Sequence, residues 1–205
     1  MATKSGFDLV TVGHFAIDTI SSPKIAPPAT ALGGPPAYVS IAAAKLGAKV
    51  SVISKVGEDF PIEYEEWLKT NHVDISGLQY VANKVTTRFI LEYQNLDKRK
   101  LRLTARAPQI KIDDIPPSLK TRAIHVAPIA NEVSTDTIRM LRTHTKTLSI
   151  DPQGFTRAFD SNGNTHPKRW DPTKIFELID VYKSSSDEIT MVTGIANLEQ
   201  ATRKI

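Results

Sequence analysis

The apolar positions of this chain fall into short runs rich in β-branched residues, and segments with helical spacing lie between these runs. Short apolar runs bounded by turn residues are typical of strands that are buried on both faces. The expected strands are residues 7–13, 49–57, 123–129, 147–154 and 181–185. The expected helices are residues 36–46, 61–71, 134–144, 171–179, 186–194 and 197–205. Strands that alternate with helices predict an α/β fold with a mainly parallel sheet, wound right-handed.

Two polar segments, residues 14–34 and 77–105, do not fit this alternation. The first is rich in proline and predicts a loop or an exposed hairpin. Within the second, residues 86–104 predict two strands joined at 95–98. Apolar and polar positions alternate in the first of these strands, so one of its faces is expected to be wet. We expect the two segments to form a small β lid over one end of the sheet.

Four residues lie at the carboxyl ends of expected strands, namely Gly13, Pro128, Asp151 and Lys183. In open α/β sheets, ligands bind at this edge. The sequence therefore places a candidate ligand site here, beneath the lid.

The stretch ALGGPPAYVSIAAAKLG at residues 31–47 places two glycines and two prolines directly before a helix. Gly33 and Gly34 lack a Cβ, so another group can approach the main chain there. Pro35 and Pro36 suit the first turn of a helix. We expect free N–H groups and the positive end of the helix dipole to favour an oxygen-rich or anionic ligand. The alternative is a tight turn that serves packing only.

The composition is that of an ordinary globular chain, long enough for a sizeable core in one domain. The chain has 205 residues, of which 40% are hydrophobic and 23% are charged, and its net charge is +4. A basic cluster at residues 98–102 has no accompanying aromatic stripe. It therefore predicts a solvated hairpin tip and no nucleic-acid partner.

Several kinds of site are excluded or disfavoured. The chain has no cysteine, which excludes disulfides, thiolate metal sites and cysteine nucleophiles. The histidines lack metal-ligand spacing, so we expect no structural metal. No stretch resembles the apolar core of a signal peptide or approaches the ~20 apolar residues of a membrane span. We therefore expect no membrane partner and a cytoplasmic location.

Several motifs in order resemble a known family. They are the stretch from Val10 to Asp18, LGGPPAYVSIAAAKLGAKVSVISKVGEDF, TTRFILEY, IDPQGFTR, the set Lys183, Ser185 and Glu188, and then Thr193-Gly194. Over about residues 7–203 the chain resembles the ribokinase-like family, also called PfkB carbohydrate kinases. The Pro-Pro-Ala-Tyr and Asp-Pro-Gln-Gly variants resemble archaeal members and the inositol-kinase-like branch. The resemblance implies that residues 1–205 form one PfkB-type kinase domain, a ribokinase-like three-layer sandwich with a small β lid.

The resemblance also implies an acceptor site for a small-molecule sugar or polyol. Gly33 and Gly34 would lie against this acceptor, and Asp18 would accept hydrogen bonds from its hydroxyls. Tyr38 stands where many relatives have asparagine, which indicates a polyol other than a furanose. Arg157 would clamp a phosphate or an acidic sugar. The alternatives are a turn cap for Asp18, a core aromatic for Tyr38 and a surface side chain for Arg157.

On the donor side, the resemblance implies ATP and Mg²⁺. Lys183 and Ser185 would lie near the nucleotide, and Glu188 would act on Mg²⁺ through water. Magnesium keeps several waters and binds few protein carboxylates, so a single acid is chemically sensible. The alternatives are a helix N-cap formed by residues 184–187 and an exposed lysine without a role at Lys183.

Members of the resembled family carry a Gly-Ala-Gly-Asp stretch, whose aspartate is the catalytic base, and this chain has no such stretch. We therefore expect no catalytic residue in this chain, an absent C-terminal part of the fold, and negligible turnover by the chain alone. The expected function is a sugar, polyol or nucleoside kinase, present here as a fragment. Inositol, a nucleoside, a ketohexose and a ketodeoxy sugar acid all stay open as acceptors.

Two other functions are alternatives. The first is a non-catalytic binding or assembly module that self-associates or pairs with a separate C-terminal chain; in the resembled family the natural homodimer surface is the lid strands. The second is a dinucleotide-dependent oxidoreductase. It requires G-x-G-x-x-G after the first strand, where this chain has Gly13-His14-Phe15-Ala16 instead.

Overall fold

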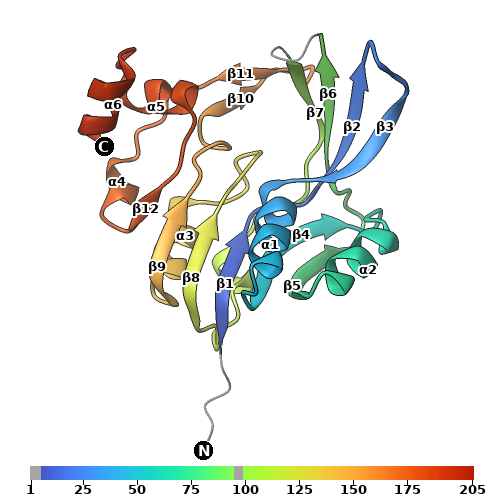
Figure 1. Cartoon of the computed structure of the whole chain (residues 1–205), viewed down its shortest axis with the longest axis horizontal. Coiled ribbons are helices and arrows are strands. Elements are labelled where there is room, and N and C mark those ends of the chain that lie inside the picture. The colour runs from blue at the N-terminus through green and yellow to red at the C-terminus, as the bar shows by residue number, and fades with distance from the viewer. Residues whose placement is uncertain (1–5, 95–98) are drawn as a thin grey trace, which may run out of the picture.

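The structure is a computed structural model that describes residues 6–94 and 99–205. It contains a six-stranded sheet, a four-stranded sheet and a two-stranded hairpin (Figure 1). The strands are β1 (Phe7–Val12), β2 (Ala16–Ser22), β3 (Ile25–Gly33), β4 (Val50–Gly57), β5 (Val73–Val81), β6 (Thr87–Tyr93), β7 (Arg99–Ala105), β8 (Thr121–Val126), β9 (Thr145–Ile150), β10 (Arg157–Phe159), β11 (Thr165–Pro167) and β12 (Val181–Tyr182). The helices are α1 (Pro35–Lys45), α2 (Ile62–Thr70), η1 (Ile112–Asp114), α3 (Thr135–Arg142), α4 (Thr173–Phe176), α5 (Ser186–Thr193) and α6 (Leu198–Lys204).

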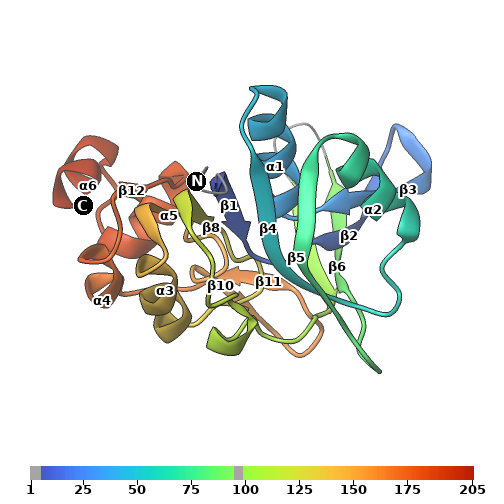
Figure 2. The same ribbon diagram turned by 90° about the horizontal axis from the view of Figure 1, so that it is seen from below.

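The six-stranded sheet is parallel throughout, in the order β12-β9-β8-β1-β4-β5. Helices α1 and α2 pack on one face, where Ala37 and Leu68 join the cluster of Val52. Helices α3 and α4 pack on the other face through Ile138 and Ile175 (Figure 2). Helices on both faces explain why the central strands read as continuous apolar runs.

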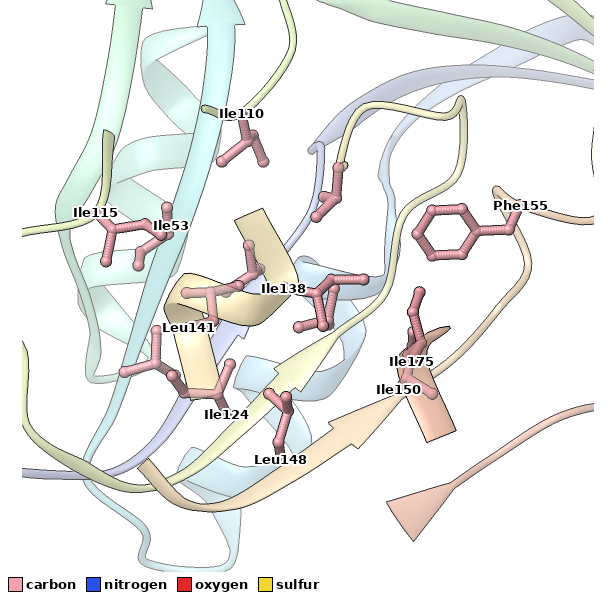
Figure 3. Packing of buried hydrophobic residues seen from close by; sticks show 14 residues of the cluster. Ile53, Ile110, Ile115, Ile124, Ile138, Leu141, Leu148, Ile150, Phe155 and Ile175 are labelled. Atoms are coloured by element: carbon pink, nitrogen blue, oxygen red, sulfur yellow. The ribbon is translucent and has the colours of Figure 1, made fainter. Parts of the chain in front are cut away.

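The largest apolar cluster lies between α3 and the sheet (Figure 3). Ile124, Leu148 and Ile150, on β8 and β9, are fully buried in it. Burial of one such side chain stabilises the fold by about 1.5–3 kcal/mol. The cluster therefore holds the carboxyl ends of β8 and β9 in fixed positions, and Asp151 follows β9 directly.

The four-stranded sheet, in the order β3-β2-β6-β7, is the lid. Its β2 and β3 form an antiparallel hairpin, β2 and β6 pair in parallel, and β6 pairs antiparallel with β7. The buried residues of β6, such as Phe89 and Leu91, alternate with more exposed ones, as the sequence pattern predicted. The expected joint at 95–98 lies outside the described residues.

One boundary of the expected lid is wrong. Residues 77–81 belong to β5, which pairs in parallel with β4 at the edge of the six-stranded sheet. Strand β5 carries Gly77, whose Cβ position is 2.3 Å from the carbonyl oxygen of Val52. An edge strand that is half exposed lacks the apolar run of the central strands, which explains why the pattern did not predict it. The lid thus takes only β6 and β7 from residues 77–105.

The segment that starts at Arg157 forms the β10–β11 hairpin. This hairpin docks on the lid, because the N–H of Leu103 on β7 donates to the carbonyl oxygen of Gly163 at 2.8 Å. The ring of Phe159 also packs with that of Phe89, at 6.3 Å between centroids. The hairpin therefore extends the lid toward α5 (Figure 1).

Regular structure is shorter than expected in the last quarter of the chain. The expected helix at 171–179 contains only the four residues of α4, and the expected strand at 181–185 contains only the two residues of β12. Among the described residues, no helix has the length and apolarity needed to cross a membrane.

Candidate functional site

A cavity of about 700 Å³ lies between the lid and the carboxyl edge of the six-stranded sheet. Its lid wall carries Asp18 on β2 together with apolar side chains of β2, β6 and β7, and α1 contributes Gly34 and Tyr38. Asp151 and Lys183 line it from the ends of β9 and β12. The cavity thus forms where ligands bind in open α/β sheets.

Asp18 is the acidic group of the lid wall. Its side chain is buried, with 9% exposed, and its Oδ1 has no hydrogen-bond partner among the described residues. Burial raises the pKa of Asp18 to about 6, although the positive charges of Arg99 and Arg157 act in the opposite direction. Asp18 is paired with Ala31 within the β2–β3 ladder. The interpretation of Asp18 as a turn cap is therefore wrong.

Gly33 makes room for that carboxylate. A Cβ at residue 33 would be 2.0 Å from Asp18 Oδ2, a separation that no side chain can adopt. Gly34 is the N-cap of α1 at φ +91°, and a Cβ there would be 2.3 Å from the carbonyl oxygen of His14. The two glycines therefore allow the Asp18 carboxylate and the His14 carbonyl to lie close to the main chain. Gly34 also lines the cavity.

The expectation of free N–H groups at the start of α1 is wrong. Positions N1 and N2 are Pro35 and Pro36, which have no N–H. The next N–H, that of Ala37, donates to the carbonyl oxygen of Gly34 at 3.1 Å. The first turn of α1 consequently offers side chains rather than amides to a ligand.

Tyr38 is the aromatic side chain that α1 places at the cavity, where Pro35 and Val39 also lie. Its exposed fraction is 62%, so the interpretation as a core aromatic is wrong. Partial burial and the nearby Asp18 raise the pKa of Tyr38, which keeps its hydroxyl protonated. Tyr38 can therefore donate a hydrogen bond or stack on a ligand ring.

Two arginines stand between this cavity and a second one. Arg157, on β10, is not the surface side chain of the alternative interpretation, because burial lowers its pKa to about 10 and its Nη1 donates to the carbonyl oxygen of Ile129 at 3.4 Å. Arg99, on β7, donates to the hydroxyl of Tyr93 at 3.2 Å. Sequence reasoning missed Arg99, because it lies in a basic run that predicted only a solvated turn. Both guanidinium groups line both cavities.

The second cavity, of about 830 Å³, lies on the side of α5 and the β10–β11 hairpin. Lys183 also lines both cavities, and its Nζ donates to Asp151 Oδ2 at 2.7 Å. This hydrogen bond raises the pKa of Lys183, so the ammonium is kept at neutral pH. Three cationic side chains therefore meet at the junction of the cavities, which is a suitable environment for phosphate oxygens.

Ser185 and Glu188 form a capping box at the start of α5. Ser185 Oγ accepts from the N–H of Glu188 at 3.3 Å, and Glu188 Oε2 accepts from the N–H of Ser185 at 2.7 Å. The helix-cap interpretation is thus confirmed. Both residues also line the second cavity. Within the described ranges no group of three or more His, Asp or Glu side chains could hold a metal directly.

Comparison with known proteins gives the following matches. A model described as "pfkB family carbohydrate kinase" matches residues 8–204. A cytidine kinase of Thermococcus kodakarensis is 29% identical over 202 residues, covering 96% of this chain and 68% of that protein. A probable fructokinase-7 of Arabidopsis thaliana is 28% identical, covering 90% of this chain and 55% of that protein. The chain thus spans between about half and two thirds of the length of these relatives.

Solved structures show the same architecture. A pyrophosphate-dependent kinase of the ribokinase family, complexed with a pyrophosphate analog and myo-inositol, superposes with a TM-score of 0.82 at 24% identity, covering 96% of this chain and 68% of that chain. A Methanocaldococcus jannaschii nucleoside kinase superposes with a TM-score of 0.70 at 19% identity, covering 97% of this chain and 69% of that chain. These likenesses establish a ribokinase-like α/β fold.

Proposed function

Because the chain belongs to the pfkB family of carbohydrate kinases, we propose that its cavity binds the hydroxyl-bearing acceptor of an ATP-dependent phosphotransfer. The acceptor lies between the lid and the carboxyl edge of the six-stranded sheet. The donor phosphates lie on the other side of Arg99 and Arg157, in the second cavity.

The observation that carries this proposal is the free oxygen of Asp18. A buried carboxylate oxygen without a partner is unfavourable by about 1–3 kcal/mol or more, and a ligand or an ordered water can supply the missing bond. Asp18 Oδ1 is buried in the wall of the cavity and has no partner among the described residues. Hydroxyl groups of a sugar, polyol or nucleoside are donors that match this acceptor.

The rest of the lid wall favours a nucleoside among the possible acceptors. Ile20, Phe89, Leu91 and Leu101 line the cavity beyond Asp18. An inositol or a ketohexose carries hydroxyls around its ring and would leave several of them unpaired against these side chains. A nucleoside has its hydroxyls on a furanose at one end and a planar base at the other. We therefore assign Tyr38 to stacking on the base, in place of the exclusion of a furanose that its sequence position indicated. The similarity to a cytidine kinase supports the same choice.

On the donor side, the three cations at the junction would hold the phosphates of ATP. Lys183 supplies a compact charge fixed by Asp151, while Arg157 and Arg99 supply planar guanidinium groups that match phosphate oxygens. A bound Mg²⁺ would neutralise phosphate charge during transfer. Glu188 would contact this ion through water, with its carboxylate already oriented by Ser185.

Isothermal titration of this chain at pH 8 tests the acceptor site directly. The ligands are cytidine, adenosine, ribose, fructose and myo-inositol, each titrated into the wild-type chain and into Asp18→Asn. We expect a nucleoside to bind the wild type most tightly, and the substitution to weaken binding about 10- to 100-fold, since charge-assisted hydrogen bonds contribute about 1.5–3 kcal/mol.

A matched control is Asp136→Asn, which changes an exposed carboxylate on α3 that pairs with Arg139. It should leave every affinity unchanged. Absence of binding by all five ligands, or equal affinity of the wild type and Asp18→Asn, would contradict the proposal. Titration with ATP·Mg and with pyrophosphate shows which donor the second cavity prefers.

A further inference from the structure

Glu132 is a fully buried carboxylate that has no role in the proposed site. Its oxygens accept hydrogen bonds from the backbone N–H groups of His14 at 2.9 Å, Ile129 at 3.0 Å and Ala130 at 2.7 Å. Across the described residues it forms no salt bridge. A buried acid that binds only main-chain donors fixes the course of the chain around it.

His14, the first of these partners, is also fully buried and does not line the cavity. Its Nε2 lies 3.0 Å from the carbonyl oxygen of Pro108, and its Nδ1 lies 2.8 Å from Thr87 Oγ1. A carbonyl oxygen only accepts, which assigns the proton to Nε2 and makes Nδ1 the acceptor for the Thr87 hydroxyl. Thr87 Oγ1 accepts in turn from the N–H of Ala107 at 3.0 Å. Every polar group in this network is therefore paired.

The network lies where the lid joins the body of the protein. His14 precedes β2, Thr87 begins β6, and Ala107 follows the end of β7. The fourth connection, after β3, passes through Gly34, whose Cβ position is 2.3 Å from the carbonyl oxygen of His14. All four connections between the lid and the six-stranded sheet thus pass beside His14.

On its other side, Glu132 fixes the loop at residues 127–131. Asn131 in this loop has φ +58°, a left-handed conformation that asparagine adopts more readily than most other residues with a side chain. The Asn131 side chain donates to the carbonyl oxygen of Arg157 at 3.1 Å, and the carbonyl oxygen of Ile129 accepts from Arg157 Nη1 at 3.4 Å. The loop therefore determines where Arg157 lies.

We propose that Glu132 and His14 are positioning residues that lock the root of the lid to the 127–131 loop, and so hold Asp18 and Arg157 at a fixed separation across the cavity. Asp18 belongs to the lid strand β2. Arg157 is held by the loop, and the hairpin that carries it also bonds to Leu103 of the lid. The expected effect on acceptor binding rests on the proposed function, whereas the connection between the lid and the 127–131 loop does not.

Glu132→Gln tests the coupling with little change in size. The glutamine amide turns one acceptor into an NH₂ group that faces backbone N–H donors, so the loop and the lid root lose part of their common anchor. We expect at least tenfold faster hydrogen exchange of the amides in β2 and β6, and about tenfold weaker binding of the nucleoside that the wild type binds best. The exchange of β8 and β9 should stay unchanged.

The matched control is Ile138→Val, which removes one methylene from the cluster under α3, away from the lid. It should lower thermal stability slightly without changing lid exchange or affinity. Thr87→Val provides a second perturbation, because it removes only the hydroxyl between His14 and Ala107, and it should accelerate the same amides.

If Glu132→Gln lowers stability while lid exchange and affinity match the control, Glu132 is merely structural and the inference is wrong. If Glu132→Gln does not fold, Thr87→Val decides by the same two readouts. Failure of the proposed function is distinguishable: the wild type would then bind no acceptor, yet the exchange measurement, which needs no ligand, would still show whether the lid root is coupled to the loop.

Discussion

The carboxylate of Asp18 occupies the space that a side chain at Gly33 would need. A Cβ at residue 33 would lie 2.0 Å from Oδ2 and 2.8 Å from Oδ1 of Asp18. Asp18 is opposite Ala31 in the β2–β3 ladder, so Gly33 is its diagonal neighbour on the same face. The glycine before α1 is thus explained by the acid on the adjacent strand.

Gly33→Ala should therefore damage the acceptor site more than the fold. The added methyl group pushes the Asp18 carboxylate out of its place, so we expect acceptor affinity to fall about tenfold or more, measured by isothermal titration. Circular dichroism should show the secondary structure of the wild type.

Gly47→Ala is the matched control. Gly47 has φ +86° and no atom within 4 Å of its Cβ position, so alanine there is strained without touching another residue. It should destabilise the chain by about 1 kcal/mol and leave acceptor affinity unchanged. Equal affinity losses for the two alanine variants would show that the Asp18–Gly33 contact is not the cause.

Asp18 should make the stability of the chain depend on pH. Its pKa of about 6 in the folded chain exceeds the ordinary 3.8. Between these values the folded chain binds more protons than the unfolded chain, so this group lowers the free energy of unfolding as pH rises from about 4 to 6. Asparagine does not titrate, so the Asp18→Asn chain does not lose this part of the free energy of unfolding. It should be more stable than the wild type at pH 7.5, by at most on the order of 3 kcal/mol.

Urea denaturation of both chains at pH 4.5 and pH 7.5 measures this effect. The stability advantage of Asp18→Asn should be small at pH 4.5 and larger at pH 7.5, and acceptor affinity of the wild type should fall as pH drops below 6. An advantage that is the same at both pH values would contradict the raised pKa.

The two residues of the α5 capping box should have different roles: Ser185 stabilises the helix, and Glu188 also contacts the metal of the phosphate donor. Ser185→Ala removes the N-cap and should lower stability by about 1 kcal/mol with little effect on ATP·Mg binding. Glu188→Gln keeps an oxygen that accepts from the N–H of Ser185, so stability should hold while the Mg²⁺ dependence of ATP binding weakens. Denaturation curves and ATP titrations with and without Mg²⁺ check both variants; a Glu188→Gln chain with unchanged Mg²⁺ dependence argues against the proposed metal contact.

Lys183→Met should weaken binding of donor phosphates. Lys183 is the ammonium at the junction of the two cavities, and its loss removes a charge that phosphate oxygens would contact. We expect roughly tenfold weaker binding of pyrophosphate or ATP and a shallower dependence of affinity on salt. Lys174→Met, at an exposed position of α4, should bind both donors as the wild type does; a loss of the same size there would indicate a general charge effect.

The parts of the fold that the sequence predicted are those with a strong local pattern. The apolar runs at β1, β4, β8 and β9 all form strands of the six-stranded sheet, as their local pattern predicts. Strand β4 is buried on both faces, whereas in β9 only Leu148 and Ile150, on one face, are fully buried. The sequence did not predict the edge strand β5 and assigned part of it to the lid, because β5 is half exposed and contains Gly77, and so lacks a continuous apolar run. The resemblance to the ribokinase-like family is confirmed, and it pointed to Asp18 and Tyr38, which the structure places at one cavity.

The residues that the sequence missed act through distant partners. Glu132 is a lone acid between a strand and a helix, and nothing nearby in the sequence shows that the N–H of His14, 118 residues away, is its partner. The expectation of free N–H groups at the start of α1 is wrong for a local reason, because the two prolines that suit a first turn also remove those N–H groups. Contacts between segments that are distant in the sequence are therefore the part of the candidate site that the sequence did not predict.

A crystal structure of this chain with the nucleoside that binds most tightly tests the central claim most directly. The account predicts a ligand hydroxyl within hydrogen-bond distance of Asp18 Oδ1 and the base against Leu91 and Leu101 of the lid. A complex in which the ligand lies outside this cavity, with Asp18 Oδ1 still without a partner, would contradict it.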